Sequence, residues 1–228
     1  MLAVRKEYAM REMRVTGVGR LSVKPDRIRL MMNLSDTKKD YEKALEASSE
    51  MSSKLQKVFT GCGFQEDDLK TTRFSVDAEY EGYTDKNGNW KQRFKGYRFE
   101  QSLKIEFPSD NERLGTVLYA LAKSGVKTEF RIQYTVSDLE KCRNELLGKA
   151  VADAKEKAAV LAAASGVKLG DIMRIDYSFG NADICSEPVM LRSMAMDCQA
   201  KEEGSYGFNM VADDIEADDN VTICFEIM

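Results

Sequence analysis

The chain contains no histidine, and this absence limits the chemistry that its other residues can perform. Without imidazole, neither a Ser-His-Asp triad nor a Cys-His pair can form, and every His-ligated metal site is excluded. General acid–base chemistry would fall to carboxylates, lysine, tyrosine or cysteine. No spacing in the sequence places two carboxylates in a credible acid–base dyad. We therefore expect no catalytic residues, no cofactor and no metal, and a protein that is not an enzyme.

Sulfur-bearing side chains gather in one stretch near the end of the chain. They are Met190, Met194 and Met196, flanked by Cys185 and Cys198. Thioether and thiolate ligands are those that copper(I) prefers, and the same groups are oxidised easily. The chance composition of a loop explains the cluster more simply than a copper site does. We expect these side chains to form an oxidation-sensitive loop, with an inert tether as the alternative.

Aromatic and basic side chains interleave between residues 80 and 99. The Asn87-Gly88 pair in this stretch is a strong signal for a hairpin turn. Nucleic-acid platforms have this composition, and so do ordinary hairpins with cross-strand aromatic pairs and solvated charges. All 34 basic side chains lie in residues 1–201 against 30 of the 38 acidic ones, too small an excess to favour nucleic acid. We predict no nucleic-acid partner, and a contact between copies of the chain at Trp90, Phe94 and Tyr97 is the hypothesis to test.

One long helix organises the rest of the sequence. Apolar and alanine side chains recur three or four residues apart over residues 139–162, which is the spacing of one helix face. Ser137 opens a capping box at the start, and Gly166 provides a left-handed stop at the end. Because the face is rich in alanine, a sheet can pack close against it, with Ala154 and Ala158 in the contact. The face consists of Leu139, Cys142, Leu146, Ala150, Ala154, Ala158, Leu161 and Ala162.

Period-two alternation predicts seven strands, and helical spacing predicts two further helices. A second long helix covers residues 41–59 and opens at Ser35-Asp36, and a short helix follows a capping box that begins at Ser109. We expect the first two strands to form a hairpin across Pro25-Asp26, and the last strand to pair inside the sheet. The elements predict an α+β fold, with an antiparallel sheet packed by two long helices and one short helix. The strands cover residues 13–23, 28–34, 74–80, 97–107, 130–136, 173–179 and 221–227.

Two strand–helix–strand segments share their order and their helix lengths, so an internal repeat is one hypothesis. Shared helix caps and terminal glycines, without a common origin, are the alternative. Residues 180–220 lack periodicity and contain Gly, Pro and acidic residues, which predicts a long, partly disordered loop. We expect residues 11–228 to form a single domain that contains this loop.

Composition and termini bound the class of protein. A hydrophobic content of 43% with 32% charged residues is typical of a soluble globular chain. No apolar run approaches the ~18 residues that cross a bilayer. The N-terminal stretch lacks an apolar core, so the sequence as written has no secretory signal and predicts a cytoplasmic protein. Five cysteines without C-x-x-C spacing favour a reducing compartment, although Cys185 and Cys198 could pair in an oxidising one.

Several motifs, in this order, resemble the SIMPL-domain family, long catalogued as a domain of unknown function. The densest match is the long helix, from Ser137-Asp138 through the alanine-rich run 150–158 to Ser165-Gly166. The closing VTICFEI is similar to the family's final strand. The match spans about residues 13–179 and 221–227. Other matching residues are Gly17-Val18-Gly19, Val23-Lys24-Pro25-Asp26, Thr71-Thr72, Tyr80, Gly96-Tyr97, Ser124-Gly125 and Leu169-Gly170.

The resemblance implies an α+β fold with antiparallel sheet and long helices, and a tendency to self-associate. Bacterial members are mostly exported envelope proteins linked to oxidative-stress defence, so it implies a periplasmic or envelope location if a leader has been removed. The family supplies no catalytic residues. We therefore predict a non-enzymatic, self-associating, SIMPL-like protein with a scaffolding or protective role. The alternative is a small-molecule or metal-binding enzyme with an unrecognised cleft.

Overall fold

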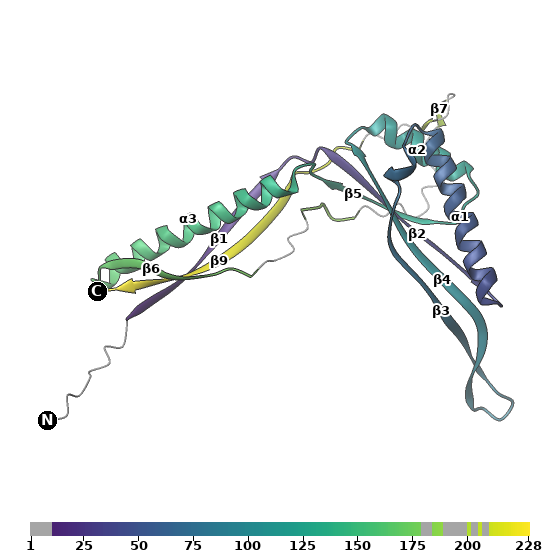
Figure 1. Cartoon of the computed structure of the whole chain (residues 1–228), viewed down its shortest axis with the longest axis horizontal. Coiled ribbons are helices and arrows are strands. Elements are labelled where there is room, and N and C mark those ends of the chain that lie inside the picture. The colour runs from purple at the N-terminus through teal and green to yellow at the C-terminus, as the bar shows by residue number, and fades with distance from the viewer. Residues whose placement is uncertain (1–10, 179–183, 189–199, 202–204, 207–209) are drawn as a thin grey trace. The chain divides into compact units, whose positions relative to one another are not determined.

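The computed structural model describes residues 11–178, 184–188, 200–201, 205–206 and 210–228. The chain divides into two compact units, each with its own antiparallel sheet (Figure 1). The first unit comprises Met1–Lys24, Val136–Ser186 and Asp213–Met228, and the second comprises Pro25–Thr135 and Glu187–Ala212. The predicted α+β class is confirmed. The expectation of one domain over residues 11–228 stays a prediction.

The second unit is built on a four-stranded sheet in the order β3-β4-β2-β5. Alternation places Leu30, Ile105 and Ile132 side by side on one face, where all three are buried. Helices α1 (Tyr41–Gly61) and α2 (Asn111–Lys123) complete this core with their apolar sides. The strands are β2 (Arg27–Lys38), β3 (Lys70–Thr84), β4 (Trp90–Pro108) and β5 (Glu129–Thr135). The smaller elements are η1 (Glu66–Asp68), β7 (Ala200–Lys201) and β8 (Ser205–Tyr206).

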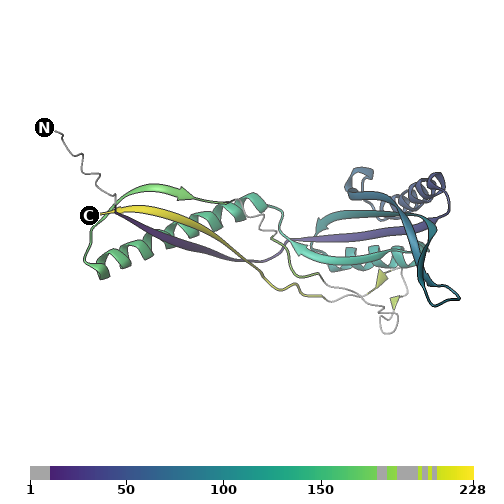
Figure 2. The same ribbon diagram turned by 90° about the horizontal axis from the view of Figure 1, so that it is seen from below.

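The first unit is a three-stranded sheet, in the order β1-β9-β6, packed by one long helix. Helix α3 (Leu139–Ser165) runs along β1 (Glu12–Val23) and β9 (Ile215–Ile227), and β6 (Leu169–Asp176) forms the other edge (Figures 1 and 2). The predicted alanine face is confirmed, because Ala150, Ala154 and Ala158 are fully buried against the sheet. Leu161 is the exception on that face, with 46% of its surface exposed.

Two glycines on β1 let the helix approach the sheet this closely. A Cβ atom at Gly17 would lie 2.7 Å from the Cβ of Ala154 and closer still to the carbonyl oxygen of Ala150. A Cβ atom at Gly19 would lie 2.9 Å from the backbone nitrogen of Ala150. Both glycines are therefore part of the packing between α3 and β1, and neither side of the contact can tolerate a larger residue without moving.

The predicted hairpin between the first two strands is wrong. β1 pairs along its whole length with β9 in the first unit, whereas β2 pairs with β4 and β5 in the second. Pro25-Asp26 does not turn the chain back on itself. The backbone N–H of Asp26 donates to the carbonyl of Thr135 at 3.1 Å, and the carbonyl of Asp26 accepts from Ser109 at 2.9 Å. These bonds hold Asp26 as an extension of β2, so the chain passes from one sheet into the other.

The helix starts also differ from the predictions by a few residues. α1 begins after Asp40 rather than at Ser35-Asp36, because β2 continues through Lys38. α2 is capped by Asp110, whose carboxylate accepts from two backbone N–H groups of the first turn. α3 is capped by Asp138, which accepts from Lys141, whereas Gly166 adopts the predicted left-handed conformation at its end. An aspartate occupies the N-cap position of all three helices, but its carboxylate accepts a cap hydrogen bond only in α2 and α3.

Two further predictions need correction. β9 begins at Ile215, so the predicted loop of residues 180–220 is too long at its C-terminal end. The two segments of the proposed repeat do not share an architecture. β2 and β3 belong to one sheet, but β5 and β6, which flank α3, belong to different sheets. The last strand does pair inside a sheet, as predicted, because β9 lies between β1 and β6.

Candidate functional site on the hairpin of β3 and β4

The hairpin of β3 and β4 is closed by a well-bonded turn. The N–H of Asp85 donates to the carbonyl of Asn89 at 2.9 Å, and Gly88 has the positive φ of +82° that the predicted Asn-Gly turn requires. The Asp85 carboxylate accepts from the backbone N–H groups of Asn87 and Asn89 and pairs with Lys91 at 2.8 Å. The bond from Lys91 and then the backbone bonds hold the pKa of Asp85 below its usual range. The turn therefore fixes how the two strands face each other.

A bulge in β4 brings aromatic side chains to one face. The register changes between Glu79 paired with Gly96 and Tyr80 paired with Phe94, so Lys95 is an extra residue on β4. In an unbroken strand, positions 94 and 97 would point to opposite faces. The bulge places both rings on the face that carries Tyr80. The ring centroids of Phe94 and Tyr97 lie 5.3 Å apart, and those of Tyr80 and Phe94 lie 5.8 Å apart, in edge-to-face geometry.

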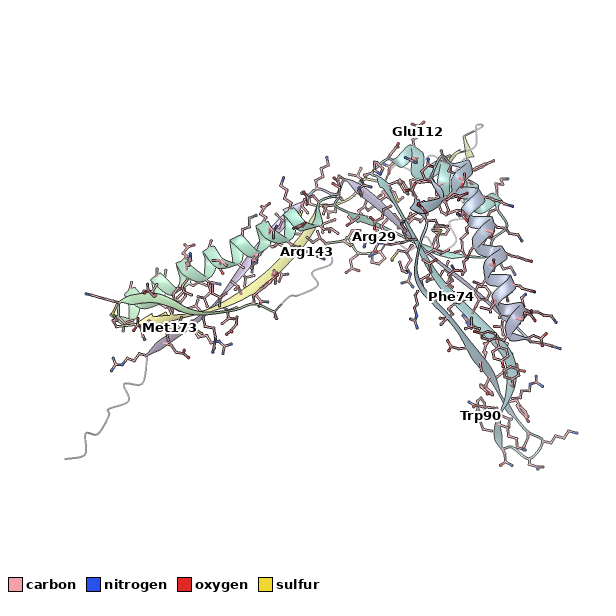
Figure 3. All side chains as sticks on the ribbon, viewed as in Figure 1. Arg29, Phe74, Trp90, Glu112, Arg143 and Met173 are labelled. Atoms are coloured by element: carbon pink, nitrogen blue, oxygen red, sulfur yellow. The ribbon has the colours of Figure 1, made fainter. Side chains whose placement is uncertain are left out.

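These rings continue into a row that reaches helix α1. The ring of Tyr41, at the start of α1, meets Tyr97 edge to face at 5.5 Å. Trp90 lies at the other end, where its indole ring covers Gly82 on the same face. We call this set the aromatic row; it consists of Tyr41, Tyr80, Trp90, Phe94 and Tyr97. Figure 3 labels Trp90 near the tip of the hairpin and Phe74 further along β3.

The aromatic row is exposed to solvent. Trp90 is 70% exposed, Tyr80 58%, and Phe94 48%. Single exposed hydrophobic residues are common on soluble proteins, but a continuous set of rings in contact is not. The row thus resembles the uncovered part of the face that α1 covers elsewhere. It includes Trp90, Phe94 and Tyr97, which the sequence singled out, and adds Tyr41 and Tyr80, which periodicity alone did not connect with them.

The opposite face of the hairpin is charged but internally neutralised. Arg93 pairs with Glu81, and Lys95 pairs with Glu79 at 3.0 Å. Hydrogen bonds from Thr37 and then from Lys95 hold the pKa of Glu79 below its usual range. Two of the basic side chains that interleave with the rings in the sequence, Arg93 and Lys95, are therefore engaged by carboxylates on their own hairpin, away from the aromatic row.

A polar groove lies on the helix-free face of the same sheet. It has a volume of about 540 Å³ and is lined by side chains from all four strands, together with Lys127 and Thr128. Its charged groups are mixed: Arg73, Arg98 and Lys127 lie among Glu100 and Glu129, and Arg98 already pairs with Glu100 at 3.0 Å. Within the described residues no group of three or more His, Cys, Asp or Glu side chains could hold a metal. No pattern in the sequence indicated this groove, because its residues come from four separate segments of the chain.

The predicted oxidation-sensitive loop falls mostly outside the described residues. Met190, Met194, Met196 and Cys198 all lie there. Cys185 is described and is half-buried. The loop, its sensitivity to oxidation and a pairing of the two cysteines stay predictions.

Comparison with known proteins places this fold in a family. The model of the SIMPL family, described as a protein of unknown function (DUF541), matches residues 13–225. The chain belongs to the SIMPL family. This confirms the resemblance that the helix and strand motifs indicated, and the match covers residues of both units.

The SIMPL chain is also similar to two curated bacterial proteins. Each is called 26 kDa periplasmic immunogenic protein, one from Brucella melitensis and one from Brucella abortus. Each is 27% identical over 161 residues, which is 71% of this chain and 64% of the relative. The match thus spans less than two thirds of the relatives. In the described residues, no helix of the SIMPL chain is long and apolar enough to cross a membrane.

Proposed function

We propose that this SIMPL protein is a non-enzymatic scaffold that self-associates through the aromatic row of its hairpin. The observation that carries the proposal is the largely exposed aromatic row, in which the rings of Tyr41, Tyr97, Phe94 and Tyr80 contact one another in succession. Aromatic side chains bury ~150–250 Å² each, so the four rings that are about half exposed or more offer roughly 400 Å². That is about half of the ~800 Å² per partner that a standard protein interface buries.

A second copy of the chain is the partner that this surface fits best. Rings packed edge to face within one row leave edges and faces that a second row can meet in the same way, as an isologous dimer requires. A charged partner would find little on this face, because Arg93 and Lys95 are paired with Glu81 and Glu79 away from the aromatic row. The same pairing argues against nucleic acid, whose phosphates need free basic side chains.

Replacing two rings tests the proposal. Trp90→Ser together with Phe94→Ser removes the most exposed ring and the ring that contacts both Tyr80 and Tyr97, without touching the core, so the fold should remain and association should weaken at least tenfold. Sedimentation velocity over a concentration series measures this, with circular dichroism as the check on folding. Tyr83→Ser is the matched control, because Tyr83 is a 40% exposed aromatic residue of the same hairpin that packs against Arg93. Equal loss in the control, or no loss in the double variant, would refute the aromatic contact.

The relatives also bear on location. Both relatives are named as periplasmic proteins, which supports an envelope location for this chain. Cell fractionation of the native host, with antibody detection, tests this part separately. Recovery only with cytoplasmic markers would contradict it, while leaving self-association through the hairpin intact.

A further inference from the structure

The first unit leaves both edges of its sheet, β1 and β6, without a neighbouring strand among the described residues. The carbonyl of Arg11 accepts from Ile227 at 3.1 Å, so odd-numbered residues near β1 bond towards β9. Even-numbered residues of β1 therefore direct their N–H and C=O groups outward. One outward group, the N–H of Val18, donates to the carboxylate of Asp153 on α3 at 2.7 Å. The outward N–H groups of Arg14 and Thr16 have no such partner in the described part of the chain.

A groove runs beside this open part of β1. It lies between the strand, at residues 14–16, and a side of α3 on which Val160 and Leu161 stand next to the charged Asp153, Glu156 and Lys157. Val160 is 63% exposed and Leu161 46% exposed. Unpaired strand groups next to an apolar patch on a helix can accept an added strand, because the backbone supplies hydrogen bonds and the patch supplies a contact for apolar side chains. The bond from Val18 to Asp153 marks one end of the open segment.

The other edge of the sheet has the complementary features. β6 exposes Ile172 at 41% and Ile175 at 53%. Their pairing partners on β9 are Phe225 and Ile223, which pack in the core under α3. Paired residues of neighbouring strands share a face, so Ile172 and Ile175 point to the α3 side of the sheet. On the other face, Arg174 and its neighbour Asp176 carry the charges.

We propose that β6 of one copy adds to the outer edge of β1 of a second copy, seating its two isoleucines against Val160 and Leu161. β1 and β6 both run antiparallel to β9, so they point the same way. A second copy placed alongside in the same orientation brings its β6 parallel to β1, with both α3 helices on one side. In that placement Ile172 and Ile175 face the apolar side of the groove. This contact uses the first unit alone and is independent of the aromatic row.

Symmetric pairings of the same edges fit less well. Two β1 edges would bring the arginines of both strands, Arg14 and Arg20, together on one seam. Two β6 edges would leave Val160 and Leu161 uncovered. In the unlike pairing, Asp171 of β6, which has no ion pair among the described residues, joins an edge that carries Arg14. The Arg14 guanidinium is 63% exposed and lies 3.9 Å from Asp176 of its own copy, so it can also meet a second carboxylate. An unlike contact gives each copy one donor edge and one acceptor edge, so association can continue beyond a dimer.

Single charges placed on each edge separate these arrangements. Val160→Asp blocks the groove beside β1, and Ile175→Asp blocks β6; both positions are more than half exposed, so folding should persist. Ala159→Asp is the matched control, an exposed position of α3 that does not line the groove. All variants are made in the full chain that also carries Trp90→Ser and Phe94→Ser, so that contacts through the aromatic row do not contribute. Light scattering and sedimentation velocity measure the mass.

The mixture decides the outcome. With Trp90→Ser and Phe94→Ser present, the chain and its Ala159→Asp variant should associate as the concentration rises. The two blocked variants, Val160→Asp and Ile175→Asp, should each stay monomeric when measured alone. An equimolar mixture of the two blocked variants should recover a species of twice the monomer mass and no larger, because one open β6 can still meet one open β1. A mixture that stays monomeric, a blocked variant that associates like the control, or a background that is monomeric at every concentration would each overturn the proposal.

Discussion

Replacing Gly17 by alanine tests the closest contact in the first unit. The added Cβ atom would lie 2.7 Å from the Cβ of Ala154 and nearer still to the carbonyl oxygen of Ala150. Ordinary contacts of this kind begin at ~3.5 Å, so α3 has to move away from β1 by roughly 1 Å. A gap of that size removes a quarter to a half of the dispersion attraction of the atoms that line it. Ala150, Ala154 and Ala158 are fully buried in this layer and all lose contacts.

The expected cost follows from these terms. Overpacking a core typically costs ~1–3 kcal/mol, and the lower entropy of the unfolded alanine chain returns about 0.4–1 kcal/mol. Because the added atom overlaps backbone atoms of α3, the cost lies at the upper end of that range, and we expect Gly17→Ala to lower the free energy of unfolding by about 2 kcal/mol. For a chain of this size, that corresponds to a fall in the melting midpoint of roughly 4–8 °C. Adding Ala154→Gly should not restore stability, because the Ala150 carbonyl, a backbone atom, remains in the way.

Gly148→Ala is the matched control, a glycine of α3, the helix against which Gly17 packs. A Cβ atom at Gly148 would meet nothing within 4 Å, and its φ is not in the left-handed region. Alanine in a helix interior is favoured over glycine by ~0.5–1 kcal/mol, so this variant should be more stable than the parent. The two substitutions are chemically the same and are expected to have opposite signs.

Circular dichroism melts give the midpoints, and hydrogen exchange with peptide mass analysis locates the change. In Gly17→Ala, faster exchange should be confined to peptides of β1, β9 and α3, while peptides of α1 exchange as in the parent. The reasoning is refuted if Gly17→Ala melts at or above the parent. It is also refuted if the loss of protection is equal in both units.

Three other predictions follow from described contacts. Ala154→Leu should destabilise the α3 layer by ~1–3 kcal/mol, and an unchanged melting midpoint would contradict that placement. The hydrogen bond from Lys157, and then that from the backbone of Val18, lowers the pKa of Asp153 in the folded protein. The ionised carboxylate therefore stabilises the fold fully above its unfolded pKa of ~3.9, and this stabilisation is lost as the pH falls through the lower folded pKa. Asp153→Asn should therefore flatten the acid decline of stability measured by urea unfolding between pH 6 and pH 2, and an unchanged slope would argue against it. Mild peroxide should oxidise the methionines at 190, 194 and 196 before the fully buried Met32, with no change in melting midpoint; peptide mass mapping that finds Met32 first would reject the sensitive loop.

The sequence by itself determined the local elements. The apolar and alanine spacing of α3 predicted a helix face that is buried in the structure, and Gly166 ended the helix as expected. Asn87-Gly88 predicted the hairpin turn, because only certain backbone conformations join two strands so tightly. These signals act over a few residues, where periodicity and backbone preferences are decisive. The family motifs likewise pointed to the SIMPL family before any fold was known.

Only the tertiary structure decided which strands pair and which faces stay open. β1 pairs with β9, about two hundred residues away, rather than with its neighbour β2. The alternation of apolar residues predicts that a segment is a strand, but it does not predict which other strand will pair with it. The bulge at Lys95 changes the parity of β4 and brings Phe94 onto the face of Tyr97, which no simple period foretells. The open edges of β1 and β6 exist only once the sheet order is set. Both proposed interfaces therefore depend on long-range pairing, which the sequence pattern leaves undetermined.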